Sequence, residues 1–132
     1  MFEKYDPTRK HIKMVADKQG FVRVLSHVGK YVPAKKGRDP RSAARDYLQD
    51  YGDLLGVRRQ HLKKLLHPIE DELTTAGTEY RFADKKSQFD LTTVAFHQTR
   101  FGLPVWEAGI SVTVKHGGAK QEALRVVGAR ST

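Results

Sequence analysis

The sequence predicts an α+β domain in which one helix packs against an antiparallel β-sheet. With 132 residues the chain has room for one domain, because domains cluster at roughly 100–150 residues. One strong helical pattern lies in the N-terminal half, and the C-terminal half contains segments in which apolar and polar residues alternate. A helix followed by such strands is typical of two layers, with one face of the sheet covering the helix.

Residues 1–38 are predicted to form a basic leader and a β-hairpin arm. The first ten residues are mostly polar and are interpreted as a loose leader. Residues 12–16 and 21–26 are short and apolar, and a polar connection ending in glycine separates them, which predicts a hairpin. Residues 31–38 contain a proline and a glycine, so we expect a loop there.

The clearest helical pattern begins at Asp39, whose side chain can accept hydrogen bonds from the first turn of a helix. Pro40 suits the first helical position, and Gly52 is typical of a helix end. A second, short helix is expected over residues 58–66, with its leucines facing inward. The apolar stripe of the main helix consists of Ala43, Ala44, Tyr47, Leu48 and Tyr51.

From residue 78 onward the pattern changes from helical to alternating. Thr78, Tyr80 and Phe82 share one face of a predicted strand, and residues 84–90 are interpreted as a charged turn. The later elements are a strand over 94–101, a turn over 102–104, a strand that reaches 114, a turn over 115–118 and a last strand over 124–127. These segments predict an antiparallel meander.

The net charge of +9 is concentrated in one half of the chain. Residues 1–66 hold 16 of the 24 Lys and Arg but 7 of the 15 acids, whereas residues 67–132 hold eight of each. Such a basic region is most often a solvated loop and helix face; as a binding surface it would attract an acidic protein surface, or a nucleic acid or other anionic polymer. The lack of a recognised nucleic-acid motif favours the protein partner. The candidate docking surface consists of Lys30, Tyr31, Lys35, Lys36, Arg38 and Arg41.

The sequence lacks the short motifs that mark common catalytic and nucleotide-binding sites. G-x-x-x-x-G-K-[ST], G-x-G-x-x-G, G-x-S-x-G and H-E-x-x-H are all missing. Without cysteine the chain has no thiol nucleophile and no sulfur ligand for zinc. His61 and His67 are six residues apart, beyond the spacing that brings two ligands onto one helical face. We therefore predict a chain without catalytic residues, metal or cofactor.

The chain shows no apolar run of the roughly 18–20 residues that a membrane-spanning helix requires. Its first residues also lack the apolar stretch of a signal peptide. We expect no membrane span, and the residues leave two alternatives, a protein that is not exported or a piece of a longer one. The second alternative, together with the resemblance described below, implies a larger exported protein, secreted or at the cell surface.

One segment has a specific pattern: residues 94–114 read VAFHQTRFGLPVWEAGISVTV. This segment resembles the fungalysin/thermolysin propeptide (FTP) motif, in which F-x-Q-T-x-x-G-x-P-V-[WF] leads into a Val-rich strand. Residues 43–48, 54–57 and 126–128 are similar to the helix, corner and closing strand of that module, so the resemblance covers residues 39–128. The matching positions are Phe96, Gln98, Thr99, Gly102, Pro104, Val105, Trp106 and Gly128.

The motif residues are expected to hold the fold rather than to perform chemistry. Gly102 and Pro104 predict a tight reversal between neighbouring strands. Phe96 and Gln98 are expected on one face of their strand, with the Gln98 amide bridging two backbone segments. Trp106 is the largest apolar side chain, and burial of such a ring removes ~150–250 Å² from water.

The resemblance implies a non-catalytic pro-region module over residues 39–132, with a cystatin-like arrangement of helix and antiparallel sheet behind the hairpin arm. In the family such modules help a secreted zinc metalloprotease to fold and keep it inactive, and relatives serve as interaction domains. The implied partner is a metalloprotease domain or a neighbouring domain of the parent chain. The family often has glycine where this chain has Glu107.

Overall fold

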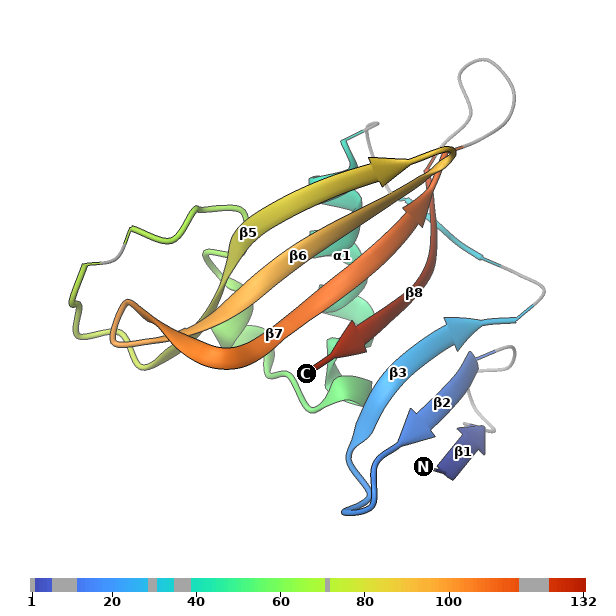
Figure 1. The fold of residues 1–132 in the computed structure, drawn as a ribbon, viewed down its shortest axis with the longest axis horizontal. Helices are drawn as coiled ribbons and strands as arrows, with labels where there is room; N and C mark the ends of the chain where they lie inside the picture. The colour runs from blue at the N-terminus through green and yellow to red at the C-terminus, as the bar shows by residue number, and fades with distance from the viewer. Residues whose placement is uncertain (1, 6–11, 29–30, 35–38, 71, 117–123) are drawn as a thin grey trace.

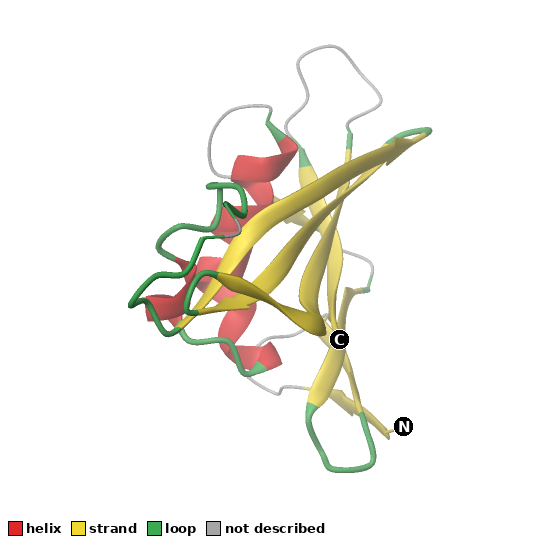
Figure 2. Ribbon diagram, turned by 60° about the vertical axis from the view of Figure 1, so that its left-hand side comes forward, coloured by secondary structure: helices red, strands yellow, loops and turns green. Residues whose placement is uncertain are grey.

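An antiparallel β-sheet forms one layer of the molecule, and the helix α1 packs on one face of it (Figures 1 and 2). The computed structural model describes residues 2–5, 12–28, 31–34, 39–70, 72–116 and 124–132. The strand order is β1-β2-β3-β8-β7-β6-β5, and β4 also pairs with β8. The predicted α+β class is confirmed. The strands are β1 (Phe2–Tyr5), β2 (Ile12–Ala16), β3 (Val22–His27), β4 (Val32–Pro33), β5 (Thr78–Gln88), β6 (Leu91–Arg100), β7 (Leu103–Lys115) and β8 (Arg125–Ser131).

The helix α1 (Pro40–Tyr51) begins and ends where the sequence predicts. The Asp39 carboxylate accepts a hydrogen bond from the backbone N–H of Arg41 at 3.1 Å, which satisfies one free donor of the first turn. The chain then continues through the short 3₁₀ helices η1 (Gly52–Leu55) and η2 (Arg59–Leu62). The second helix is therefore shorter than predicted, although Leu62 and its neighbour Leu65 are buried as expected.

The core lies between α1 and the inner face of the sheet. Ala44 and Leu48 of α1 are buried, and so are Phe96 of β6 and Val112 and Val114 of β7. The alternating pattern thus identified the inner face correctly over most of these strands. Burial of each large apolar side chain contributes about 1.5–3 kcal/mol. The helix covers the middle of β6 and β7, so the ends of these strands stay exposed.

Three predicted irregular segments contain strands, so these predictions were wrong. The supposed loop over 31–38 includes the two-residue strand β4, which pairs with β8. Part of the supposed loose leader is β1, which pairs with β2 from Phe2↔Ala16 to Tyr5↔Lys13. The supposed charged turn belongs mostly to β5, which continues to Gln88 past a bulge between Phe82 and Asp84. β1 and β5 are edge strands, where backbone pairing with a neighbour is compatible with polar side chains, so the apolar pattern is missing.

The hairpin arm β2–β3 continues the same sheet as the rest of the chain. Leu25 of β3 pairs with Ala129 of β8, and Gly128 lies between Ser26 on one side and Thr113 on the other. A Cβ atom at Gly128 would overlap the carbonyl oxygen of Leu25. Glycine is therefore required where β3 approaches β8.

None of the helices in the described ranges is both long enough and apolar enough to cross a bilayer.

Candidate functional site

The segment that resembles the propeptide motif contains a large bulge between β6 and β7. His97 pairs with Gly109, but the next paired position joins Thr99 to Pro104. Only Gln98 of β6 therefore stands opposite residues 105–108 of β7. Such a bulge bends a strand and changes the direction in which its side chains point.

The bulge turns Trp106 outward, contrary to the expectation that this ring is buried. Its side chain is 87% exposed. The neighbouring Glu107 has a φ of 54°, in the left-handed region that glycine occupies most easily. Glycine, which the motif often has at this position, is the residue that the conformation favours, so Glu107 adopts it at a cost in backbone energy. The alternation of the sequence could not reveal Trp106 as a surface residue.

Phe96 and Gln98 lie on β6 opposite Phe82 and Tyr80 of β5, with no irregularity in that pairing. Phe96 is fully buried and meets Phe82 edge-on, with ring centroids 6.4 Å apart. Gln98 is only partly buried, and in the described part of the chain its amide makes no hydrogen bond. Thr99 is fully buried instead, and its hydroxyl donates to the carbonyl of Glu79 at 3.4 Å. The pairing therefore leaves Phe96 and Gln98 on one face of β6, as predicted, whereas the predicted bridging role of the Gln98 amide is wrong.

The turn between β6 and β7 is formed by Phe101 and Gly102, both with positive φ. Pro104 already belongs to β7, so the reversal begins one residue earlier than predicted. A Cβ atom at Gly102 would overlap the carbonyl oxygen of Glu72, which shows how closely the preceding loop approaches. The backbone N–H of Thr74 donates to Phe101 at 2.8 Å.

These contacts bring exposed apolar side chains from three segments to one end of the sheet, at the β6–β7 turn in Figure 1. We call this region the apolar end, and it consists of Leu73, Phe101, Leu103 and Trp106. A hollow of about 540 Å³ lies beside it, between His97, Trp106 and Thr132. A cluster of exposed apolar groups on a folded surface is typical of an interaction site.

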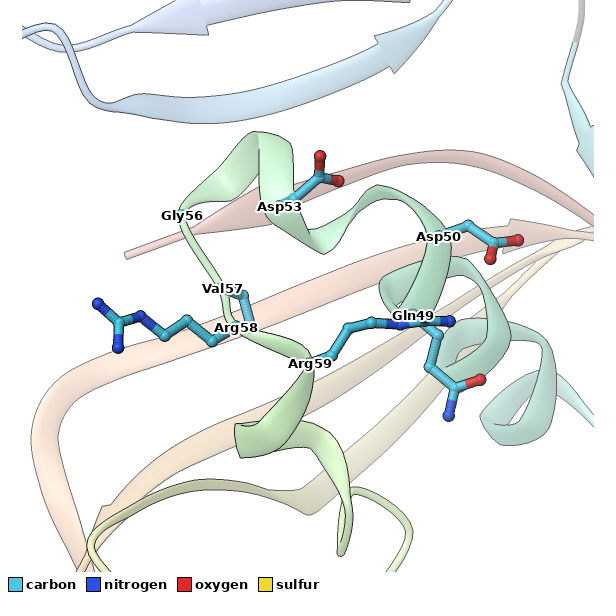
Figure 3. A pocket seen from close by; sticks show the side chains of 7 residues that line it. All are labelled: Gln49, Asp50, Asp53, Gly56, Val57, Arg58 and Arg59. Carbon is cyan, nitrogen blue, oxygen red and sulfur yellow. The ribbon is translucent and has the colours of Figure 1, made fainter.

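A second hollow, of about 710 Å³, lies where α1 meets the 3₁₀ helices. Figure 3 shows that Arg58 and Arg59 leave the turn in opposite directions, with Asp50 and Asp53 on the side of η1 and α1. Both aspartates have interactions of their own. The charged groups of this hollow therefore do not converge on one point where a ligand could bind.

The candidate docking surface of the basic segment is only partly covered by the structure. Lys30, Lys35, Lys36 and Arg38 lie outside the described residues. The Arg41 guanidinium lies 3.5 Å from the Asp39 carboxylate and 5.4 Å from the centroid of the Phe82 ring. Tyr31 lies beneath the ammonium of Lys115, 5.7 Å from its ring centroid. Both described members thus make contacts within the chain.

One buried histidine connects the arm to the helix. His27 of β3 is almost fully buried, and its Nε2 is hydrogen-bonded to the hydroxyl of Tyr47 at 2.6 Å. Its ring also meets Tyr51 edge-on, with centroids 5.3 Å apart. Burial lowers the pKa of His27 below its ordinary value of 6.5, because the charged imidazolium is poorly solvated there.

In the described ranges, no group of three or more His, Asp and Glu side chains is arranged to hold a metal ion. Comparison of the chain with protein-family models, with curated proteins and with solved structures finds no match in any of the three. Its function is therefore inferred from its own residues and geometry, and from the resemblance of residues 94–114.

Proposed function

We propose that the chain is a non-catalytic module of the fungalysin/thermolysin propeptide type, which binds a protein partner through the apolar end. The main observation behind this proposal is the exposure of Trp106. This residue lies in the middle of the segment that resembles the family motif. Tryptophan is enriched among the residues that contribute most of the binding energy at protein interfaces.

The backbone beside Trp106 supports this proposal. A left-handed conformation costs a residue other than glycine roughly 1–2 kcal/mol, and Glu107 adopts it next to the exposed ring. Conformations of this kind cluster at functional sites, where other contacts maintain them. Here the pairing of Thr99 with Pro104 holds one side of the bulge, and the pairing of His97 with Gly109 holds the other.

The proposed partner is the catalytic domain of a zinc metalloprotease, or a neighbouring domain of the parent chain, in an exported protein. A helix on one face of an antiparallel sheet fits the cystatin-like arrangement of such modules. Binding through the apolar end requires only a complementary apolar pocket on the partner. The module would act as a chaperone and inhibitor of that protease.

The experiment mixes the chain with a mature zinc metalloprotease of the thermolysin type. Trp106 is the only tryptophan of this chain, so binding is detected by a label on the chain or by inhibition of the protease. We expect Trp106→Ser to weaken the affinity about 30-fold or more, as for a central interface residue. Phe21→Ser is the matched control, because Phe21 is also exposed but lies at the β2–β3 turn. Unchanged affinity of Trp106→Ser, or an absence of binding and inhibition, would contradict the proposal.

A further inference from the structure

The opposite end of the sheet exposes another aromatic residue on an unfavourable backbone conformation. Phe89 and Asp90 form the turn between β5 and β6. Phe89 is 95% exposed and has a φ of 56°. Glycine, asparagine and aspartate are the residues that such a turn position favours. Neither burial nor backbone geometry therefore explains a phenylalanine here, and this combination points to a function outside the fold.

Cations surround this turn. Leu91 pairs with Lys115, and Lys115 pairs with Arg125, so these strand ends lie in one row across the sheet, beside the β5–β6 turn in Figure 1. We call this region the basic end, and it consists of Lys85, Lys86, Phe89, Lys115 and Arg125. The two acids beside them, Asp84 and Asp90, leave a balance of +2 among the described residues of this region.

The acids neutralise these cations only weakly. The Nζ of Lys115 lies 3.8 Å from the Asp90 carboxylate, and the Nζ of Lys86 lies 4.0 Å from that of Asp84. All four side chains are substantially exposed to water, where such long ion pairs contribute little. The Lys115 ammonium also lies over the Tyr31 ring, but its side chain is 43% exposed, so the positive groups remain accessible to an anionic surface.

We propose that the basic end docks on a lipid bilayer that carries anionic headgroups. The Phe89 ring enters the boundary between headgroups and acyl chains, and the lysines and Arg125 contact the headgroups. An apolar ring combined with flanking cations is the pattern by which peripheral proteins bind anionic membranes. A nucleic acid fits less well, because base stacking uses rings along a groove, whereas Phe89 projects alone from a turn of two residues.

This inference is independent of the proposed function, because it concerns the other end of the sheet. The bulge that holds Trp106 lies opposite Gln98, and Lys115 pairs with Leu91, seven positions away on β6, which corresponds to roughly 20–25 Å along a strand. The emission of Trp106 therefore distinguishes the two ends. It should shift if the apolar end enters a membrane and stay constant if the basic end does.

The experiment measures co-sedimentation of the full chain with vesicles of phosphatidylcholine alone or mixed with phosphatidylglycerol, at low ionic strength. We expect binding to the mixed vesicles only, without a shift of Trp106 emission. Phe89→Asn should reduce the partition coefficient about tenfold while raising the temperature of unfolding, because asparagine tolerates the left-handed conformation. The double variant Lys85→Ser with Lys86→Ser should also reduce the partition coefficient about tenfold or more.

Phe21→Asn is the matched control, since it removes an exposed phenylalanine from another turn and should leave vesicle binding unchanged. Equal binding to both kinds of vesicle, or undiminished binding of Phe89→Asn, would overturn the proposal. A shift of Trp106 emission on mixing would overturn it in favour of the apolar end. Binding to a single-stranded oligonucleotide but not to mixed vesicles would replace the bilayer by a nucleic acid.

Discussion

The apolar end and the basic end both expose an aromatic ring at or next to a residue with a left-handed backbone, but they are built differently. At the apolar end, the carbonyl oxygen of Glu72 lies close against Gly102, and the four-residue bulge of β7 stands opposite Gln98. At the basic end, a turn of two residues carries Phe89 with an even ladder of pairs behind it, from Leu91↔Lys115 to His97↔Gly109.

This difference teaches how the two surfaces are adapted to different partners. Several segments hold the backbone that carries the rings of the apolar end, which lowers the entropy cost of matching a shaped protein pocket. The basic end is a single projecting turn, whose ring and lysines need no fixed mutual geometry to meet a fluid lipid surface. Two substitutions and one change of pH test this comparison through the stability of the folded chain.

The largest effect is expected from Gly102→Ala, which should dismantle the support of the apolar end. The added Cβ would overlap the carbonyl oxygen of Glu72, and alanine would have to adopt a φ of 83°. Since the left-handed conformation alone costs roughly 1–2 kcal/mol, we expect the free energy of unfolding to fall by about 3 kcal/mol or more. Urea denaturation followed by circular dichroism measures this change.

Gly56→Ala is the control for that variant. Gly56 also has a positive φ, of 78°, but a Cβ atom there would meet no other atom within 4 Å. It should therefore show only the backbone cost of roughly 1–2 kcal/mol. Equal losses for the two variants would mean that the loop does not buttress the apolar end.

An intermediate effect is expected when the pH is lowered, and it concerns the part of the sheet nearer the basic end. His27 adjoins Ser26, which lies across from Gly128 and Thr113. Because the folded chain lowers the pKa of His27, the unfolded chain binds more protons once the pH falls below about 6.5. The contribution of His27 to the free energy of unfolding should be fully present above that pH. Below it the free energy of unfolding should decrease by at most about 1.4 kcal/mol per pH unit from this group.

Denaturation curves between roughly pH 5 and pH 8, a window around the ordinary histidine pKa, measure this dependence. In His27→Phe the contribution of the imidazole to the slope of the free energy of unfolding against pH should disappear, whatever the stability of the variant at neutral pH. An identical slope in the two proteins would show that the His27–Tyr47 contact is not what responds to acid.

The smallest effect is expected from Glu107→Gly, which relieves the backbone beside Trp106. Glycine removes a left-handed cost of roughly 1–2 kcal/mol but adds about 0.5–1 kcal/mol of chain entropy in the unfolded state. We therefore expect the free energy of unfolding to rise by about 0.5–1 kcal/mol, measured by thermal and urea denaturation. A loss of stability would indicate that the Glu107 side chain itself supports the bulge.

The sequence predicted those parts of the fold in which local pattern and burial agree. The helix was correct at both ends, and the start was predictable because Asp39 caps the first turn locally. Gly52, by contrast, keeps right-handed helical dihedrals and begins the 3₁₀ helix η1. The inner face of β7 was recognisable because Ile110, Val112 and Val114 alternate with polar residues. The arm was identifiable because its two apolar segments flank a short polar turn.

The surfaces could not be predicted, because they depend on the register between strands. A bulge of four residues leaves no mark in the pattern of residues 103–109, so Trp106 was expected in the core. Phe89 fell inside a predicted charged turn because the edge strand that presents it consists mainly of polar residues. The positive φ at Phe89, Phe101 and Glu107 likewise contradicts local preference and follows from the tertiary structure.

The place of β8 in the sheet also governs the order in which the protein can be assembled. Leu25 has to find Ala129, more than a hundred positions later, and β8 is inserted between β3 and β7. During synthesis the early hairpin therefore waits with an unpaired edge until the last strand emerges from the ribosome. Contacts so distant along the chain slow folding, and they make this waiting edge the point at which newly made copies can associate wrongly.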